Sequence, residues 1–221
     1  MSHGPVRGPW LTIGLATLMG AVYWLGQPTF DLFVYARHGA QQGELWRLFT
    51  GHLVHFNFDH LFWDLLALLI LGTVVELDSR RSLLSVLLFS IGGVSVWLWF
   101  GAVALGAYSG LSGALTGVVV LAAVRQWQRT TNPVFLWVLA GTVAKIVFEL
   151  ITHRTLFTSL SEYAVPGAHL AGFLAGAVYV WLERCPFLLT TSSVTSTSPP
   201  AREGPSAQSV GIRDRVRVWG W

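Results

Sequence analysis

Long apolar stretches separated by short polar ones dominate the chain. Six of them approach the length of a membrane-spanning helix, at about residues 11–25, 58–77, 83–107, 112–124, 133–151 and 165–182. A helix needs roughly 20 apolar residues to cross a bilayer. The fourth stretch is shorter, so we expect its first residue, Ser112, to lie below the membrane surface. The pattern predicts an all-α, polytopic membrane protein built as a six-transmembrane-helix bundle.

The first apolar stretch follows a short polar segment, residues 1–8, that contains Arg7. A basic residue followed by an apolar run is also the pattern of a signal peptide. We favour a retained first helix, because no small-x-small cleavage site follows and the next residues are Gln27 and Pro28. On this interpretation residues 1–8 are a cytoplasmic N-terminus and residues 9–184 form the membrane domain.

Residues 27–56 are too polar to span a bilayer, yet they are rich in aromatic side chains. Amphipathic segments of this kind lie in the membrane interface. We therefore expect an external loop that contains short helices.

The composition changes after residue 184. Residues 190–198 are almost all Ser and Thr, and Pro199 and Pro200 follow them. Such a segment cannot bury an apolar core. We expect residues 185–221 to be a disordered cytoplasmic tail. Its basic and aromatic end, 213–221, could touch a membrane surface, but a solvated tail is the simpler interpretation.

The composition agrees with a membrane protein. The chain is 53% hydrophobic and 11% charged, whereas soluble domains carry about 25% charged residues. Its net charge of +3 does not indicate nucleic-acid binding, because the arginines are scattered at the ends of the apolar stretches. The one cysteine, Cys185, excludes an internal disulfide and a multi-cysteine zinc site.

Arginines also predict the orientation. Six spans place both termini on one side of the membrane. That side carries Arg7, Arg80, Arg81, Arg125, Arg129 and Arg184, and the other carries Arg37, Arg47 and Arg154. Basic loops stay in the cytoplasm. We therefore expect cytoplasmic termini, with Ser112 near the outer face.

The chemistry centres on Gly110-Leu111-Ser112-Gly113, at the start of the fourth stretch. A serine hydroxyl is a weak nucleophile until a base takes its proton. The sixth stretch offers His169 within Gly167-Ala168-His169-Leu170-Ala171-Gly172. Small residues repeat at a spacing of four in both stretches, which allows close helix packing in lipid. We predict that helices four and six pack closely and bring His169 within hydrogen-bond reach of Ser112.

The second stretch carries His60 and Asp64, which share one face of a helix. His52 and His55 precede them. One interpretation is structural, with each side chain bonded to nearby backbone. These residues could also ligate a metal, but no His-Glu-x-x-His motif is present and the spacing mixes loop with helix. We expect no metal and no other cofactor.

The fifth stretch contains Lys145, the single lysine, and Glu149 four residues later. We predict that the two pair at i,i+4, with Lys145 also able to reach Asp64. The alternative is a lysine that extends to the membrane interface. Polar residues inside a span also suit a small transporter, but the chain lacks the repeat that such proteins show.

Hydrolysis of a peptide bond passes through an oxyanion that needs hydrogen-bond donors, and losing one donor costs on the order of 3 kcal/mol. The backbone N–H of Ser112 and the side chain of His60 are the candidate donors.

The chain resembles the rhomboids, a family of intramembrane serine proteases. The resemblance covers residues 9–184 and rests on Glu44-Leu45-Trp46-Arg47, His55, His60-Leu61-Phe62-Trp63-Asp64, Gly110-Leu111-Ser112-Gly113 and Ala168-His169-Leu170-Ala171-Gly172. It implies a Ser112–His169 catalytic dyad. It also implies that His60 and Asp64 support the oxyanion, together with Gly110. The secondary candidates are His55 and Arg47, from the matching segments, and Lys145 and Glu149, from the fifth stretch.

Asp64 departs from the family pattern, which has Asn at this position. An ionised Asp cannot donate a hydrogen bond and repels an oxyanion. Three states remain open: a protonated Asp64, an Asp64 paired with a cation, or an Asp64 that orients His169 or His60.

The resemblance implies a serine endopeptidase, in a bacterial inner membrane, that cleaves single-span membrane proteins near the outer face. Within the family, the compact length and the Gly-Leu-Ser-Gly context are similar to the rhombosortase subgroup, which processes C-terminal sorting tails. The alternative is a binding protein and not an enzyme: an inactive rhomboid-like protein that binds membrane-protein clients. The expected partners are a transmembrane substrate and the lipid bilayer, and no nucleic acid.

Overall fold

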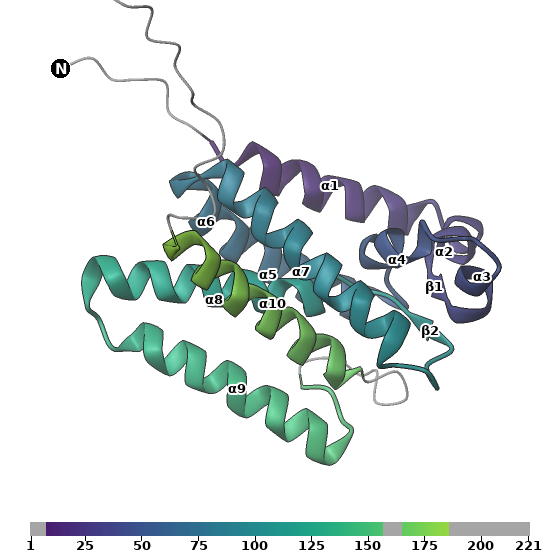
Figure 1. Cartoon of the computed structure of the whole chain (residues 1–221). Helices are drawn as coiled ribbons and strands as arrows, with labels where there is room; N and C mark the ends of the chain where they lie inside the picture. Colours follow the sequence, from purple (N-terminus) through teal and green to yellow (C-terminus); the bar gives the residue numbers. More distant parts are fainter. Residues whose placement is uncertain (1–7, 157–164, 186–221) are drawn as a thin grey trace, which may run out of the picture. The chain divides into compact units, whose positions relative to one another are not determined.

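Long helices make up most of the chain in the computed structural model (Figure 1), which describes residues 8–156 and 165–185. Six long helical segments follow the six apolar stretches. They are α1 (Trp10–Trp24), the continuous run of α5 (Phe58–Ala67), η2 (Leu68–Gly72) and α6 (Thr73–Asp78), α7 (Arg80–Phe100), α8 (Ser112–Thr130), α9 (Val134–Thr152) and α10 (Pro166–Arg184). The predicted all-α membrane architecture is confirmed.

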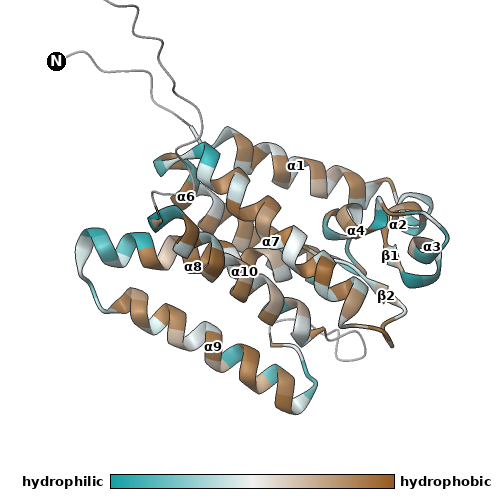
Figure 2. Ribbon diagram, viewed as in Figure 1, coloured by the Kyte–Doolittle hydropathy of each residue, from teal (hydrophilic) through white to brown (hydrophobic). Residues whose placement is uncertain are grey.

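Three of these segments are long and apolar enough to cross a membrane by length and composition alone: Phe58–Asp78, Arg80–Phe100 and Val134–Thr152. The α1 helix is apolar but shorter. More than half of the residues of α8 are buried, so this helix faces other helices more than lipid. Apolar residues cover most of α1 and α9, and hydrophilic residues gather at the end of α8 (Figure 2).

Two of the predicted boundaries were wrong. The third stretch was expected to reach residue 107, but α7 ends at Phe100. The guanidinium of Arg37 donates to the carbonyls of Leu98 (3.0 Å) and Trp99 (3.1 Å) and so satisfies this helix end from a distant loop. The fourth stretch was expected to end near residue 124, but α8 continues to Thr130.

The extension of α8 has a physical cause. Arginine and glutamine are good helix formers, so the polar residues after 124 continue the helix. Arg125 donates to Asp78 at 3.1 Å and to Glu183 at 2.9 Å. The end of α8 is therefore held to the ends of α6 and α10.

The second segment contains a π-helical turn, η2, that hydropathy did not predict. The α1 helix packs against it at Gly72, where an added Cβ would lie 2.8 Å from the Thr12 hydroxyl oxygen. Glycine is therefore required for this close approach.

Helices α8 and α10 pack closely through small residues, as predicted. A Cβ on Gly172 would overlap the carbonyl of Gly113, and one on Gly176 would overlap the backbone of Gly117. Close packing through glycines at a spacing of four is typical of helices in lipid.

The α9 helix lies at one edge of the helical unit (Figure 1). Only 11% of its apolar window is buried, against 39% for the other two segments named above. Its two buried residues are Ile146 and Glu149.

The predicted loop at 27–56 contains short helices: α2 (Gln27–Phe33), α3 (Arg37–Gln41), α4 (Arg47–Thr50) and the 3-10 turn η1 (Gly51–Leu53). It also contains β1 (Tyr35–Ala36), which pairs antiparallel with β2 (Ala107–Tyr108), with Tyr35 opposite Tyr108. This short sheet ties the first loop to the segment that leads into Ser112. The predicted N-terminal segment and tail lie almost wholly outside the described residues.

Candidate active site

Ser112 is the first residue of α8, and its side chain is partly exposed. The chain enters the helix through Gly110, whose φ of +105° suits glycine. A Cβ at Gly110 would also press on the imidazole of His60. Both constraints require glycine at this position, two residues before the serine.

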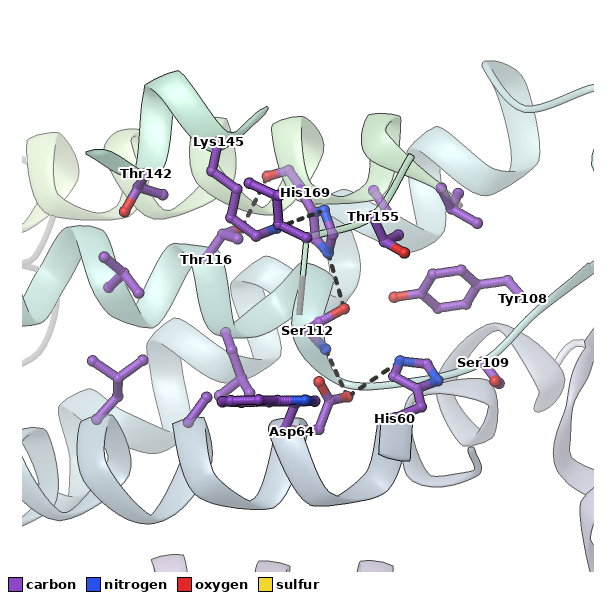
Figure 3. Close-up of a pocket in the computed structure, with 18 residues that line it drawn as sticks. His60, Asp64, Tyr108, Ser109, Ser112, Thr116, Thr142, Lys145, Thr155 and His169 are labelled. Atoms are coloured by element: carbon purple, nitrogen blue, oxygen red, sulfur yellow. Dashed lines mark hydrogen bonds and ion pairs between the residues drawn. The ribbon is translucent and has the colours of Figure 1, made fainter. Parts of the chain in front are cut away.

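The Ser112 hydroxyl faces His169 of α10, with Oγ and Nε2 3.0 Å apart (Figure 3). The two helices are joined beside this contact. The Thr116 hydroxyl donates to the backbone carbonyl of His169 at 2.9 Å, and Gly113 packs against Gly172. The backbone packing of α8 and α10 therefore determines the separation of the two side chains.

The other nitrogen of His169 faces a carboxylate. His169 Nδ1 lies 2.7 Å from Oε2 of Glu149, which is fully buried in α9. The second carboxylate oxygen, Oε1, accepts from Lys145 Nζ at 2.7 Å and from the Leu156 N–H at 3.0 Å. The expected Lys145–Glu149 pair is present, and it lies against the histidine.

Asp64 lies on the opposite side of Ser112 from His169 (Figure 3). Its Oδ2 accepts from the N–H of Leu111 at 2.6 Å and from that of Ser112 at 3.0 Å. His55 Nε2 is 2.9 Å from the same oxygen, and His60 Nε2 is 3.8 Å away. An acceptor at this place caps the start of α8, where the first N–H groups of a helix lack partners.

This geometry changes two of the expectations for Asp64. Among the described residues, the hydrogen bonds of the Asp64 carboxylate are with His55, Leu111 and Ser112, and Lys145 bonds to Glu149 instead. Asp64 therefore does not orient His169, because Glu149 occupies that place. The Ser112 N–H, expected to be free for an oxyanion, donates to Asp64.

His60 lines the cavity beside Ser112. Its backbone N–H donates to the side chain of Asn57, which caps α5. Within the described part of the chain, its buried Nδ1 has no hydrogen-bond partner. Because Nδ1 is inaccessible to solvent, it is not presented to the cavity.

His52 and Tyr108 support the site from the side of the first loop. Burial lowers the pKa of His52 to about 4 and raises that of Tyr108 above its usual range, so both are neutral near pH 7. Their rings lie 5.3 Å apart, edge to face. The Tyr108 hydroxyl donates to the Gly110 carbonyl at 3.0 Å, which holds the turn before Ser112.

A cavity of about 240 Å³ opens beside the serine. Its walls come from α5, α8, α9 and α10. Apolar side chains make up much of the lining, among them Trp63, Leu71, Leu115 and Val119. His60, Asp64 and His169 lie around Ser112 (Figure 3).

His55, His60 and Asp64 place one potential ligand atom each within 4.8 Å of one another. Two histidines and a carboxylate are ligand types that zinc accepts. However, Asp64 Oδ2 already receives two backbone N–H groups and faces His55. The cluster satisfies its carboxylate by hydrogen bonds, so we assign no metal to it.

Two of the candidate residues, Arg47 and Gly110, form hydrogen bonds with the first loop. Arg47 donates to Glu44 at 2.5 Å and to the carbonyls of Asp31 and Val34 at 2.7 and 2.9 Å, which braces the first loop. The N–H of Gly110 donates to the Gly51 carbonyl at 3.0 Å and is not directed at the cavity.

Sequence reasoning missed Thr116 and Tyr108. Thr116 lies one turn after Ser112, on the same face of the helix, and this spacing was the available signal. Tyr108 gave no local signal, because its position depends on the pairing of β1 with β2.

The fold and the site define a class: a polytopic helical membrane protein with a hydroxyl and an imidazole in contact between two helices. The family model of the rhomboid domain matches residues 42–185. The chain therefore belongs to the rhomboid family of intramembrane proteases and is an integral membrane protein. The comparison with curated proteins gave no match.

Proposed function

We propose that this chain is a serine endopeptidase that cleaves single-span membrane proteins within or beside the bilayer. The observation that carries the proposal is the 3.0 Å contact between Ser112 Oγ and His169 Nε2, at the wall of a cavity. A serine in contact with a base is the arrangement that nucleophilic catalysis requires.

In the proposed reaction, Ser112 Oγ attacks the scissile carbonyl carbon while His169 Nε2 takes the hydroxyl proton. An Oγ–C bond forms, and the scissile C–N bond of this tetrahedral intermediate then breaks as His169 gives the proton to the leaving amine. Water then attacks the acyl-enzyme, with His169 again as the base, and releases the new carboxyl terminus. Every proton taken from a nucleophile is returned to a leaving group.

The tetrahedral intermediate needs hydrogen-bond donors. His60 is the candidate side chain, because it lines the cavity beside Ser112. The Ser112 N–H is the candidate backbone donor. It has to turn from Asp64, which it contacts at 3.0 Å, toward the substrate oxygen.

Asp64 has a structural role in this proposal. Two backbone N–H groups and His55 hold its carboxylate at the start of α8, where a negative charge is favourable to the helix dipole. The same charge lies next to the place where the oxyanion forms, so it works against that step.

An apolar cavity of about 240 Å³ is smaller than typical small-molecule pockets. It suits a short stretch of an apolar polypeptide, as in the transmembrane segment of a single-span protein. The narrower substrate class, C-terminal sorting tails of the rhombosortase kind, rests on the Gly-Leu-Ser-Gly context around Ser112.

The proposed orientation places Ser112 toward the outer face of a bacterial inner membrane. Arg125 joins the ends of α6, α8 and α10 through Asp78 and Glu183. Arg129 lies at the end of α8, and Arg80 and Arg81 begin α7 directly after α6. Basic residues favour the cytoplasmic side. Residues 9–184 would then be the catalytic membrane domain, with residues 1–8 and 185–221 in the cytoplasm.

The test is labelling by a fluorophosphonate probe in membranes. We expect the wild type to be labelled and Ser112→Ala and His169→Ala to lose at least 99% of the labelling rate, since each removes one partner of a unit worth about 10³-fold or more. Thermal unfolding of each variant in detergent controls for folding.

A second function, binding of membrane-protein clients without cleavage, is favoured by one observation. Asp64 occupies the Ser112 N–H in the resting structure. A folded wild type that the probe does not label would overturn the protease proposal and support client binding.

A further inference from the structure

We propose that Glu149 is a positioning residue that completes a Ser112–His169–Glu149 triad. This inference rests on the proposed protease function and assigns a third residue to the same site. The carboxylate comes from α9, a helix that contributes neither the serine nor the histidine.

The two nitrogens of His169 have complementary partners. Nδ1 faces Glu149 Oε2 at 2.7 Å, and Nε2 faces Ser112 Oγ at 3.0 Å. An ionised carboxylate accepts hydrogen bonds and cannot donate one. The proton of neutral His169 therefore lies on Nδ1, which leaves the lone pair of Nε2 directed at the serine hydroxyl.

The neighbouring ammonium supports this assignment of the proton. Lys145 Nζ is 3.4 Å from His169 Nδ1 and 2.7 Å from Glu149 Oε1. If Nδ1 instead accepted from Lys145, its lone pair would lie 2.7 Å from a carboxylate oxygen, which is repulsive. The shorter contact, to Glu149, thus determines the tautomer.

The two carboxylate oxygens have separate partners. Oε1 takes Lys145 and the Leu156 N–H, whereas Oε2 contacts His169. When Nε2 takes the serine proton, His169 becomes a cation beside the Glu149 carboxylate. An anion placed there stabilises the imidazolium as it forms.

The position of Glu149 on α9 argues against a purely packing role. Exposed apolar side chains cover most of this helix, yet it buries a carboxylate completely, and does so against His169. Buried ionic groups are expensive at membrane depth and usually functional.

A second buried glutamate provides the contrast. Glu76 pairs with Arg80 at i,i+4, as Glu149 pairs with Lys145, but its carboxylate accepts the N–H groups of Leu11 and Thr12. Glu76 therefore caps the start of α1 and has no contact with the serine site among the described residues.

The experiment compares fluorophosphonate labelling of the full-length protein in detergent, with the maximal rate (kinact) separated from probe binding (KI). The variants are Glu149→Gln, the double variant Lys145→Met/Glu149→Gln, and the matched control Glu76→Gln. The double variant removes both charges of the pair, so it leaves no unpaired lysine at membrane depth. Thermal unfolding reports the folded fraction of each.

We expect Glu149→Gln and the double variant to lower kinact at least 100-fold with KI within threefold of the wild type. The corresponding amide in a serine triad stabilises the wrong histidine tautomer. Glu76→Gln should keep kinact within threefold once corrected for folded protein.

The inference is overturned if folded Glu149→Gln or the folded double variant keeps kinact within threefold of the wild type. It is also overturned if kinact falls equally in Glu76→Gln, because loss of a buried ion pair would then explain the defect. In both cases labelling that still depends on Ser112 and His169 would leave the protease proposal intact. A folded wild type without labelling would instead remove the protease proposal itself.

Discussion

The approach of α8 to α10 can be tested at Gly172. An added Cβ in Gly172→Ala would overlap the carbonyl oxygen of Gly113 and lie 2.7 Å from its carbonyl carbon and 2.8 Å from Thr116 Oγ1. Ordinary contact begins near 3.4 Å, so the helices must separate by at least the difference, 0.7 Å. Both contacts involve short, constrained groups, so no flexible side chain can relieve them.

This shift acts directly on the two side chains of the proposed dyad. Ser112 Oγ and His169 Nε2 are 3.0 Å apart, and a displacement of 0.7 Å along their axis would break the hydrogen bond. A misplacement of about 1 Å in a catalytic site costs roughly 100-fold in rate. Overpacking also destabilises by about 1–3 kcal/mol. We therefore expect Gly172→Ala to lower the labelling rate of folded protein about 100-fold, and Gly172→Val to abolish it.

The assay is the fluorophosphonate labelling rate, corrected for the folded fraction measured by thermal unfolding. The matched control is Gly92→Ala in α7, because no atom lies within 4 Å of a Cβ built there. If Gly172→Ala labels and unfolds like the wild type, helix spacing at this glycine does not control the site and the reasoning is refuted.

Two further predictions concern charge and pH. Asp64→Asn should raise the labelling rate about tenfold, equivalent to about 1.4 kcal/mol, because an amide still accepts the Ser112 N–H but no longer repels an oxyanion; a tenfold fall would show that the charge is needed. His52, with a pKa lowered to about 4 by burial, stays neutral in the folded state while the unfolded state binds a proton below pH 6.5. Stability should therefore fall by about 3 kcal/mol as the pH drops from 6.5 to 4. Thermal unfolding across this range measures the slope, and His52→Phe should flatten it.

The positions of the long helices and the Lys145–Glu149 ion pair could be predicted from local sequence. Hydrophobic runs predicted each of the long helical segments, because an apolar stretch of that length has no other stable place than lipid. Lys145 and Glu149 were predicted to pair because side chains at i,i+4 meet on any helix, and their atoms are 2.7 Å apart. Both inferences need only the geometry of one helix.

The ends of the helices depended on residues far away in the chain. The α7 helix ends at Phe100, short of the end of its apolar stretch, where Arg37 binds its last carbonyls. The α8 helix continues beyond its apolar stretch because Arg125 bonds to Asp78 and Glu183 on neighbouring segments. Hydropathy along one segment contains no information about such partners.

The sequence by itself determined which residues are candidates for the chemistry, since Ser112, His169, Asp64 and Glu149 stand out as polar groups in apolar surroundings. Only the tertiary structure decided how they are combined. It places Glu149, and not Asp64, against His169, and it places Asp64 against the start of α8. The physical reason is that a distance between helices depends on the side-chain volumes of both surfaces at once. Helical periodicity gives only distances within one helix.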